Sequence, residues 1–90
     1  MQITCSKLYE KQLKEILESI IDIDYNAAKN FKIYLDTIIL NLPTKVQKYP
    51  KSIYFDDENI KDIEFQGCRI PFYIDEKEKN YFLLGITAKN

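Results

Sequence analysis

The last third of the chain, residues 60–88, constrains the fold more than any other stretch. Two runs of alternating apolar residues, 60–65 and 68–75, are separated by a Gln-Gly pair, and a third run follows a charged break at 81–88. β-Branched and aromatic residues dominate these runs, and Gly67 tolerates the positive φ of a tight turn. The pattern therefore predicts a three-stranded antiparallel meander that the rest of the chain covers on one face.

Strict alternation assigns the side chains of this meander to two faces. The inward set is Ile63, Phe65, Cys68, Ile70, Phe72, Ile74, Phe82, Leu84 and Ile86. The outward set is Asp62, Glu64, Arg69, Pro71, Tyr73, Asp75, Tyr81, Leu83, Gly85 and Thr87. Because proline has no backbone N–H, we expect the middle strand to be unpaired or bulged at Pro71.

Two amphipathic helices are expected upstream of the meander. A short edge strand at residues 1–5 leads to a first helix, which Ser6 caps and whose apolar residues recur every three or four positions. Asp24 suits the cap of a second helix from about Tyr25 to Leu42, and Pro43 marks its end. Since only a short gap separates the helices, they should form an antiparallel hairpin.

The composition excludes several classes of protein. Ninety residues, of which 46% are hydrophobic, predict one small globular domain over 1–90. The net charge of −1 gives no global field that attracts nucleic acid, and the absence of histidine removes the commonest metal ligand, so no metal or cofactor is expected. Cys5 and Cys68 fit a reduced, cytoplasmic chain, and no run approaches the roughly 18 apolar residues of a membrane span.

Two aliphatic residues interrupt the amphipathic pattern of the second helix. Ile33 and Leu40 are seven residues apart and lie on the side opposite Phe31 and Leu35. Single exposed aliphatic residues are normal on a protein surface. A ridge of two, however, also fits a contact with a partner protein, so both interpretations stay open here.

Residues 44–59 read as a loop with a basic first half. Lys45, Lys48 and Lys51 alternate with tyrosines, including Tyr49, before three acidic residues reverse the sign. Lysines and aromatic rings in one loop can contact phosphates and stack on bases. The same composition is also that of an ordinary solvated loop, so a nucleic-acid contact is one of two interpretations.

Arg69 is the main chemical group on the outward face of the meander. Its guanidinium could hold a phosphate with two hydrogen bonds, beside Tyr73, which could stack on a base or donate a proton. Asp62 and Glu64 lie across the ladder, however, and opposite charges at such positions form ordinary ion pairs that stabilise a sheet. An exposed pair of this kind contributes only about 0–1 kcal/mol.

The chain resembles the RelE/ParE superfamily of small bacterial toxins from type II toxin–antitoxin systems. The most specific piece is Ile63 to Tyr73, in which an arginine is followed by Ile-Pro and two aromatic residues, although Cys68 stands where an aromatic residue is usual. Tyr81 to Lys89 is similar to the family's closing strand and basic end. The helix pair from Leu13 to Leu42, followed by proline, extends the resemblance over nearly the whole length.

The resemblance implies an α+β fold of order β-α-α-β-β-β, with the helix hairpin packed on one face of a mainly antiparallel four-stranded sheet. It implies that the first strand lies beside the last. It also implies a partner, a cognate antitoxin that wraps the toxin with a helix and an added strand. Ile33 and Leu40 are the antitoxin contacts that we expect.

The resemblance implies one of two targets. RelE-like members cleave mRNA on the ribosome, and Arg69, Lys61 and Lys89 would then be the phosphate and transition-state contacts. ParE-like members inhibit DNA gyrase and need no catalytic residues of their own. The missing histidine and the net charge of −1 depart from the RelE-like pattern and favour the ParE-like one. A family member that binds only its partner is a third alternative.

Overall fold

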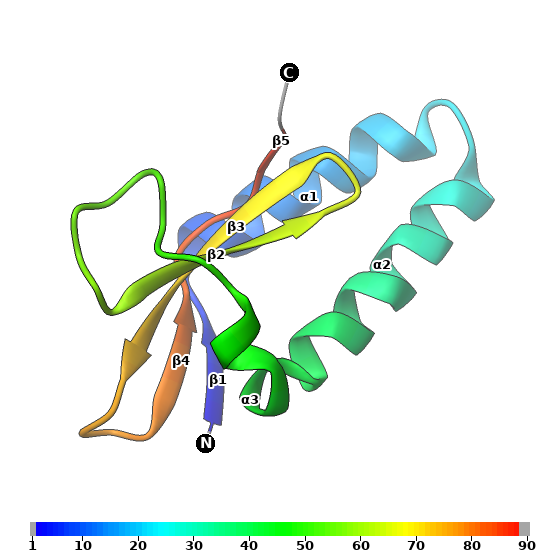
Figure 1. Cartoon of the computed structure of the whole chain (residues 1–90). Helices are drawn as coiled ribbons and strands as arrows, with labels where there is room; N and C mark the ends of the chain where they lie inside the picture. Colours follow the sequence, from blue (N-terminus) through cyan, green and yellow to red (C-terminus); the bar gives the residue numbers. More distant parts are fainter. Residues whose placement is uncertain (1, 89–90) are drawn as a thin grey trace.

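The computed structural model describes residues 2–88, which form helices and a mixed sheet (Figure 1). The elements are β1 (Gln2–Cys5), α1 (Lys7–Ile21), α2 (Tyr25–Leu40), α3 (Leu42–Lys45), the 3-10 helix η1 (Val46–Lys48), β2 (Ile60–Phe65), β3 (Cys68–Asp75), β4 (Asn80–Leu83) and β5 (Thr87–Ala88).

The two long helices begin at the residues that the sequence predicts. The Ser6 hydroxyl accepts a hydrogen bond from the Tyr9 N–H, and the Asp24 carboxylate accepts from the N–H groups of Asn26 and Ala27. Each cap satisfies backbone donors that have no partner inside the helix. The helix hairpin that the sequence predicts is therefore confirmed, with both caps in place.

The strands follow the order β1-β4-β3-β2, and β5 pairs with β3 beyond the end of β4. All pairs are antiparallel except β1 with β4, which is parallel. The expected α+β architecture is thus confirmed, with the first strand beside the closing one. The turn between β2 and β3 is formed by Gln66 and Gly67, both with positive φ, as a two-residue hairpin requires.

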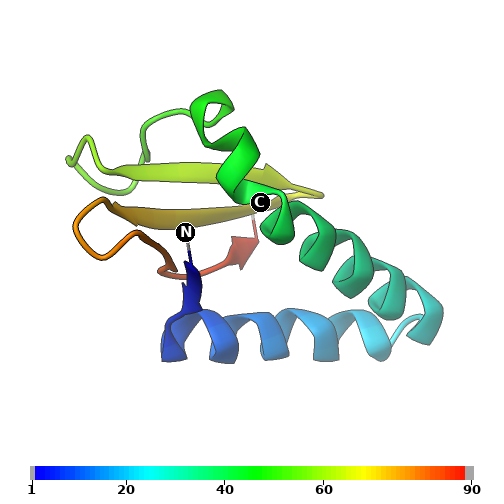
Figure 2. The same cartoon turned by 90° about the horizontal axis from the view of Figure 1, so that it is seen from below.

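The hydrophobic core lies between the sheet and the helix hairpin. Figure 2 shows α1 opposite the sheet, with α2 slanting from the interhelical turn back toward the strands. Leu35 of α2 is fully buried against side chains from the middle of the sheet. The sheet contributes Ile63, Phe65, Cys68, Ile70, Phe72, Tyr81 and Leu83 to this core. We call this side of the sheet the helix face.

The facing of the closing strand differs from the prediction. Leu83 pairs with Phe72 and Tyr81 pairs with Ile74, so Tyr81 and Leu83 point into the core. Phe82 pairs with Tyr73 on the opposite side. The reason is the register, because a shift of one residue exchanges the two faces of a whole strand. Ile86 is nevertheless buried, since the chain leaves the β4 ladder after Leu83.

The segment between the hairpin and the meander is more structured than a simple loop. Helix α2 ends at Leu40, and Pro43 lies in the first turn of α3, where its missing N–H costs nothing. Further on, Ser52 donates its backbone N–H to Ile60, and the Asp62 N–H donates to Pro50. These bonds attach the chain to the outer edge of β2, which is otherwise an edge strand of the sheet.

The ladder continues through Pro71 without a bulge. Pro71 pairs with Asp62, whose N–H points away from β3 toward Pro50. The pair is therefore a non-hydrogen-bonded one, in which no donor is needed from proline toward β2. The Pro71 carbonyl still accepts from Leu84, at 2.9 Å. The expected break is therefore wrong toward β2. It is confirmed on the other side of β3, where Ile70 and Pro71 lie between the pairs with β5 and the pairs with β4. None of the helices in the described part of the chain is long and apolar enough to cross a membrane.

Candidate functional site

The sheet surface opposite the helix face centres on an ionic cluster of Asp62, Glu64 and Arg69. Arg69 Nη1 donates to Asp62 Oδ2 at 3.0 Å, and Nη2 pairs with Glu64 Oε1. Strands β2 and β3 position the three side chains, since Glu64 and Arg69 are direct cross-strand partners and Asp62 lies two residues away on the same face. The cross-strand ion pair that we considered in the sequence is confirmed.

Asp62 and Arg69 of this cluster are buried, which the sequence did not predict, whereas the Glu64 side chain is 55% exposed. Asp62 has no exposed surface, and Arg69 is 8% exposed. The hydrogen bond that Arg69 donates to Asp62, together with the charges of the nearby carboxylates, raises the pKa of the Arg69 guanidinium. Asp62 Oδ1 and Arg69 Nε have no hydrogen-bond partner among the described residues. The interpretation of an open face with an exposed pair is corrected, because another part of the chain covers it.

The cover is residues 51–58, which we call the 51–58 loop. The Ile53 N–H donates to Asp62 Oδ2 at 2.9 Å, so the buried carboxylate holds both the arginine and the loop backbone. The buried Ser52 hydroxyl accepts from the Tyr54 N–H, and the Tyr54 and Thr87 hydroxyls share a hydrogen bond of 3.1 Å. We call the sheet surface under this loop the loop face.

Of the three residues predicted as catalytic contacts, the two that the structure describes, Lys61 and Arg69, lie on opposite faces of the sheet. Lys61 pairs with Phe72 and therefore points to the helix face, where its Nζ reaches the Val46 carbonyl at 3.3 Å. Arg69 lies on the opposite face of the same sheet. Lys89 lies outside the described residues. Arg69 and Lys61 therefore form no shared phosphate site in this arrangement.

The predicted nucleic-acid residues are spread over different elements. Lys45 in α3 and Lys48 in η1 are exposed. Lys51 forms ion pairs with Asp56 at 3.0 Å and Glu58 at 3.4 Å.

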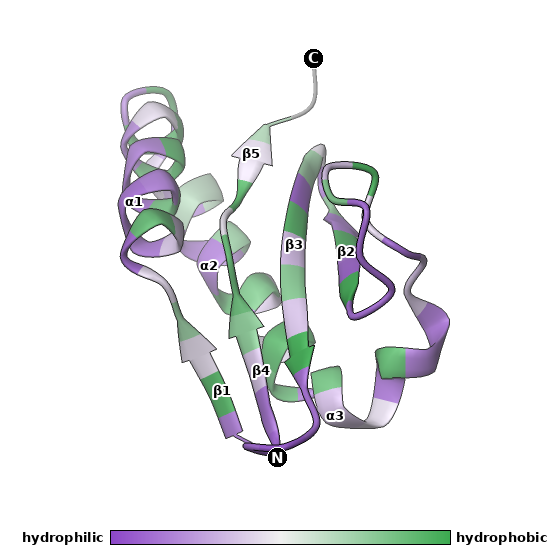
Figure 3. Cartoon of the chain, turned by 90° about the vertical axis from the view of Figure 1, so that its left-hand side faces the viewer, coloured by the Kyte–Doolittle hydropathy of each residue, from purple (hydrophilic) through white to green (hydrophobic). Residues whose placement is uncertain are grey.

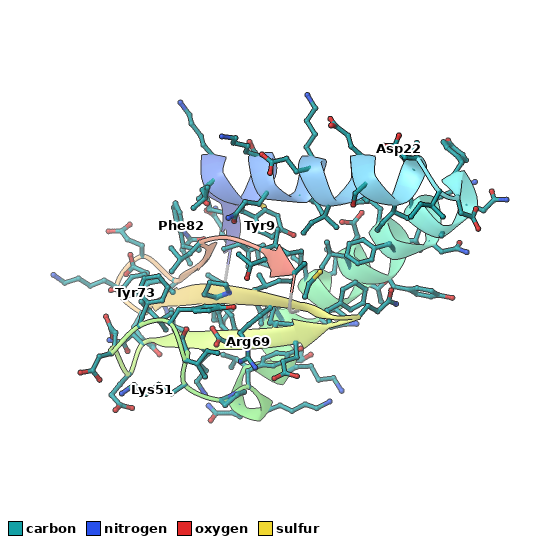
Figure 4. All side chains as sticks on the ribbon, turned by 90° about the horizontal axis from the view of Figure 1, so that it is seen from above. Tyr9, Asp22, Lys51, Arg69, Tyr73 and Phe82 are labelled. Atoms are coloured by element: carbon teal, nitrogen blue, oxygen red, sulfur yellow. The ribbon has the colours of Figure 1, made fainter. Side chains whose placement is uncertain are left out.

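The fourth predicted nucleic-acid residue, Tyr73, is half-buried on the loop face beside Phe82. Figure 4 shows both rings at the end of the sheet away from the interhelical turn that Asp22 marks. The described structure therefore does not gather the three lysines and Tyr73 into one basic surface. Their contact with nucleic acid stays a prediction.

An apolar pocket on the loop face was missed by the sequence reasoning. It has a volume of about 180 Å³, and its walls include Leu8 from α1, Tyr54 and Phe55 from the 51–58 loop, and Leu84. Figure 3 shows how α1 and the loop stand at opposite edges of the sheet surface that faces the viewer. The signal in the sequence was Ile53-Tyr54-Phe55, three large apolar residues in a row within a polar loop.

The two predicted antitoxin contacts are exposed on α2. Ile33 is 50% exposed and Leu40 is 76% exposed, so the helix does present an apolar ridge away from the core. A separate groove of about 590 Å³ lies between the two helices, with walls that include Leu13, Leu17 and Ile39. The hairpin therefore offers apolar surface on two sides of α2. No group of three or more potential metal ligands occurs within residues 2–88.

Comparisons with known proteins give relatives by structure only. No protein-family model matches the sequence, and no curated protein does so at a significant level.

A chain of the chromosomal ParDE toxin–antitoxin system from Pseudomonas aeruginosa superposes with a TM-score of 0.72 at 14% identity, covering 100% of this chain and 97% of that one. A chain of the toxin–antitoxin complex RelBE2 from Mycobacterium tuberculosis gives 0.67 at 8% identity, covering 98% and 96%. A conserved hypothetical protein from Helicobacter pylori gives 0.62 at 18% identity, covering 98% and 93%. The chain therefore has the RelE/ParE fold.

Proposed function

We propose that this protein is the toxin of a type II toxin–antitoxin pair, that it is ParE-like and inhibits DNA gyrase by binding, and that a cognate antitoxin neutralises it. The fold supports the first part, since chains from a ParDE system and from a RelBE2 complex share it over nearly their whole lengths. The chemistry of the loop face supports the second part.

The ion pairs of Arg69 are the observation that favours a gyrase inhibitor over a ribonuclease. Arg69 is the sole arginine of the chain, and it would be the central phosphate contact of a RelE-like enzyme. Its guanidinium is instead paired with Asp62 and Glu64 beneath the 51–58 loop. A phosphate would have to displace two carboxylates and the loop, and the remaining charge of the cluster would repel it. Inhibition by protein–protein contact has no such requirement.

The exposed ridge of α2 supports an antitoxin partner. Ile33 and Leu40 lie one above the other on the helix surface, and apolar side chains at this spacing fit an amphipathic helix of a partner. The ridge contributes nothing to the core, so its exposure is explained once a partner covers it. The added strand of an antitoxin would find an unpaired edge at β1, since β1 pairs with β4 on one side only among the described strands.

Pulse labelling tests the target. The protein is induced in a bacterial host, and incorporation of radioactive thymidine and methionine is followed side by side. We expect thymidine incorporation to fall first, because gyrase inhibition stops replication. An early fall of methionine incorporation alone would overturn the gyrase proposal in favour of RelE-like mRNA cleavage. If neither falls and growth continues, the toxin proposal fails and the third alternative, a member that binds only its partner, replaces it.

The antitoxin contact is tested in the same host. Co-expression of the small open reading frame next to the toxin gene should restore growth. The exchange of Ile33 and Leu40 to serine should reduce this rescue while leaving the growth arrest in place. Full rescue of that double variant would show that the antitoxin binds elsewhere.

A further inference from the structure

The 51–58 loop exposes three large apolar side chains in a row. Ile53 is 70% exposed, Tyr54 48% and Phe55 43%. A hydrophobic run of this kind is unfavourable on the surface of a free protein, and loops that carry such runs are commonly binding elements. The run lies over the loop face, where Ile53 bonds Asp62 and Tyr54 bonds Thr87, whereas the Ile33–Leu40 ridge belongs to α2.

Polar groups that add little net stability to the fold hold the loop in one conformation. Asp62 Oδ2 accepts from the Ile53 N–H, the Ser52 hydroxyl accepts from the Tyr54 N–H, and Tyr54 bonds Thr87. Buried ion pairs are poor sources of net stability, because desolvation offsets the attraction between the charges. A buried cluster that also binds a loop backbone is better explained as a device that fixes geometry. A binding loop that is already ordered loses less entropy when a partner arrives.

The pocket beside the loop has the size of one side chain. Its volume is about 180 Å³, whereas pockets for cofactors and drug-sized ligands are usually about 300–1,000 Å³. The Leu8, Phe55 and Leu84 side chains give it apolar walls. The Ser6 hydroxyl donates to the Leu84 carbonyl at 2.9 Å, and this bond connects the start of α1 to the pocket wall that Leu84 forms. A single apolar side chain of a protein partner fits this space.

The charges around the loop select the kind of partner. Residues 51–58 carry one lysine and three acidic residues, so their net charge is −2. Asp56 and Glu58 are largely exposed, and each also lies within 4 Å of the Lys51 ammonium. An acidic rim repels the phosphates of nucleic acid and attracts lysine or arginine.

We propose that the 51–58 loop and its adjoining pocket form the surface that contacts the target, and that they bind a protein presenting one apolar side chain flanked by basic residues. This inference deepens the proposed function and rests on it. It separates the two contacts of the toxin, with the target on the loop side of the sheet and the antitoxin on the helix hairpin.

A supercoiling assay with purified bacterial DNA gyrase tests the proposal. The test variant is Ile53→Ser, and the matched control is Ile23→Ser, which changes the same residue type at another exposed position in the interhelical turn. We expect Ile53→Ser to raise the concentration for half inhibition at least about tenfold, the size typical of a central interface residue. Ile23→Ser should stay within about twofold of the unchanged protein. Thermal unfolding of both variants checks that the fold is intact.

A second variant tests the charge of the rim. Glu58→Lys reverses one charge without touching the pocket, and it should weaken inhibition and flatten its dependence on salt. Inhibition by Ile53→Ser at the level of the unchanged protein would overturn the surface assignment, and so would an equal loss in Ile23→Ser. If the unchanged protein does not inhibit gyrase at all, the proposed function fails first, and the target assignment of this loop fails with it.

Discussion

Both faces of the sheet contain fully buried side chains, but different kinds of interaction bury them. On the helix face, Ile63, Phe72 and Leu83 are fully buried against other apolar side chains. On the loop face, Asp62 is equally buried, yet its contacts are an arginine and a backbone N–H. Apolar packing is non-directional and tolerates rearrangement, whereas charged hydrogen bonds require a fixed geometry. The helix face therefore supplies stability, and the loop face supplies the position of one loop.

The closing strand offers the sharpest test of this difference, because two neighbouring leucines point to opposite faces. Leu83→Ala removes a fully buried side chain from the core and should cost about 3–5 kcal/mol of the free energy of unfolding. Leu84→Ala removes a half-buried side chain from the loop face and should cost about 1 kcal/mol. Urea denaturation of both variants gives the comparison. Equal losses in the free energy of unfolding would mean that the two faces contribute equally to the stability of the domain.

The ionic cluster gives a second, smaller effect. Asp62→Asn keeps the shape of the side chain but removes the charge that binds both Arg69 and the Ile53 N–H. We expect a lower unfolding temperature and hydrogen exchange of the Ile53 amide that is faster by on the order of tenfold.

Glu64→Gln is the matched control for this change, since the Glu64 side chain is 55% exposed and pairs with Arg69, whereas the Ile53 N–H donates to Asp62. It should change Ile53 exchange much less. Unchanged exchange in Asp62→Asn would show that the loop is held by its other contacts, and would remove the geometric role of the cluster.

Local sequence signals predicted the helix face well, with one exception. The helix caps, the hairpin and the alternation in β2 and β3 follow from neighbouring residues, which is why Ser6 and Asp24 could be assigned in advance. The faces to which the β4 side chains point could not be predicted, because the charged residues before β4 do not fix the length of the turn. One residue more or less in that turn exchanges Leu83 with Leu84. The pairing of Leu83 with Phe72 decides it, and that contact is not local.

The loop face was harder to predict, because its burial depends on a segment far from β3. The sequence placed Asp62, Glu64 and Arg69 on one face correctly, and it allowed for the ion pair. It could not show that Ile53 would cover them, since the loop carries no periodic pattern. Lys61, by contrast, could have been placed, because the alternation that puts Ile63 and Phe65 on the inner face puts Lys61 there too, away from Arg69.

The helix face and the loop face should also respond differently to alkaline pH. Burial raises the pKa of Tyr9 and of Cys68, and of Tyr81 as well, so the core favours their neutral forms. When a folded-state pKa is raised, its contribution to stability is complete below the unfolded value and is lost as the pH rises through the folded value. The loss should therefore begin above the ordinary values of 9.0 for the thiol and 10.0 for the phenols.

This pH effect is the smallest that we predict and the one most specific to the helix face. Arg69 keeps its charge over the same range, since its pKa is raised by its hydrogen bond to Asp62. The pKa of Lys51 in the 51–58 loop is raised by its hydrogen bond to Asp56, so its contribution begins to be lost only above the ordinary value of 10.5. Between pH 8 and pH 11 we expect the free energy of unfolding to fall by a fraction of the roughly 1.4 kcal/mol per pH unit that one fully linked group contributes. Tyr9→Phe should shrink this fall, because phenylalanine does not titrate. Urea denaturation of both proteins at the two pH values measures it, and an equal fall would place the alkaline sensitivity outside the contact of α1 with the sheet.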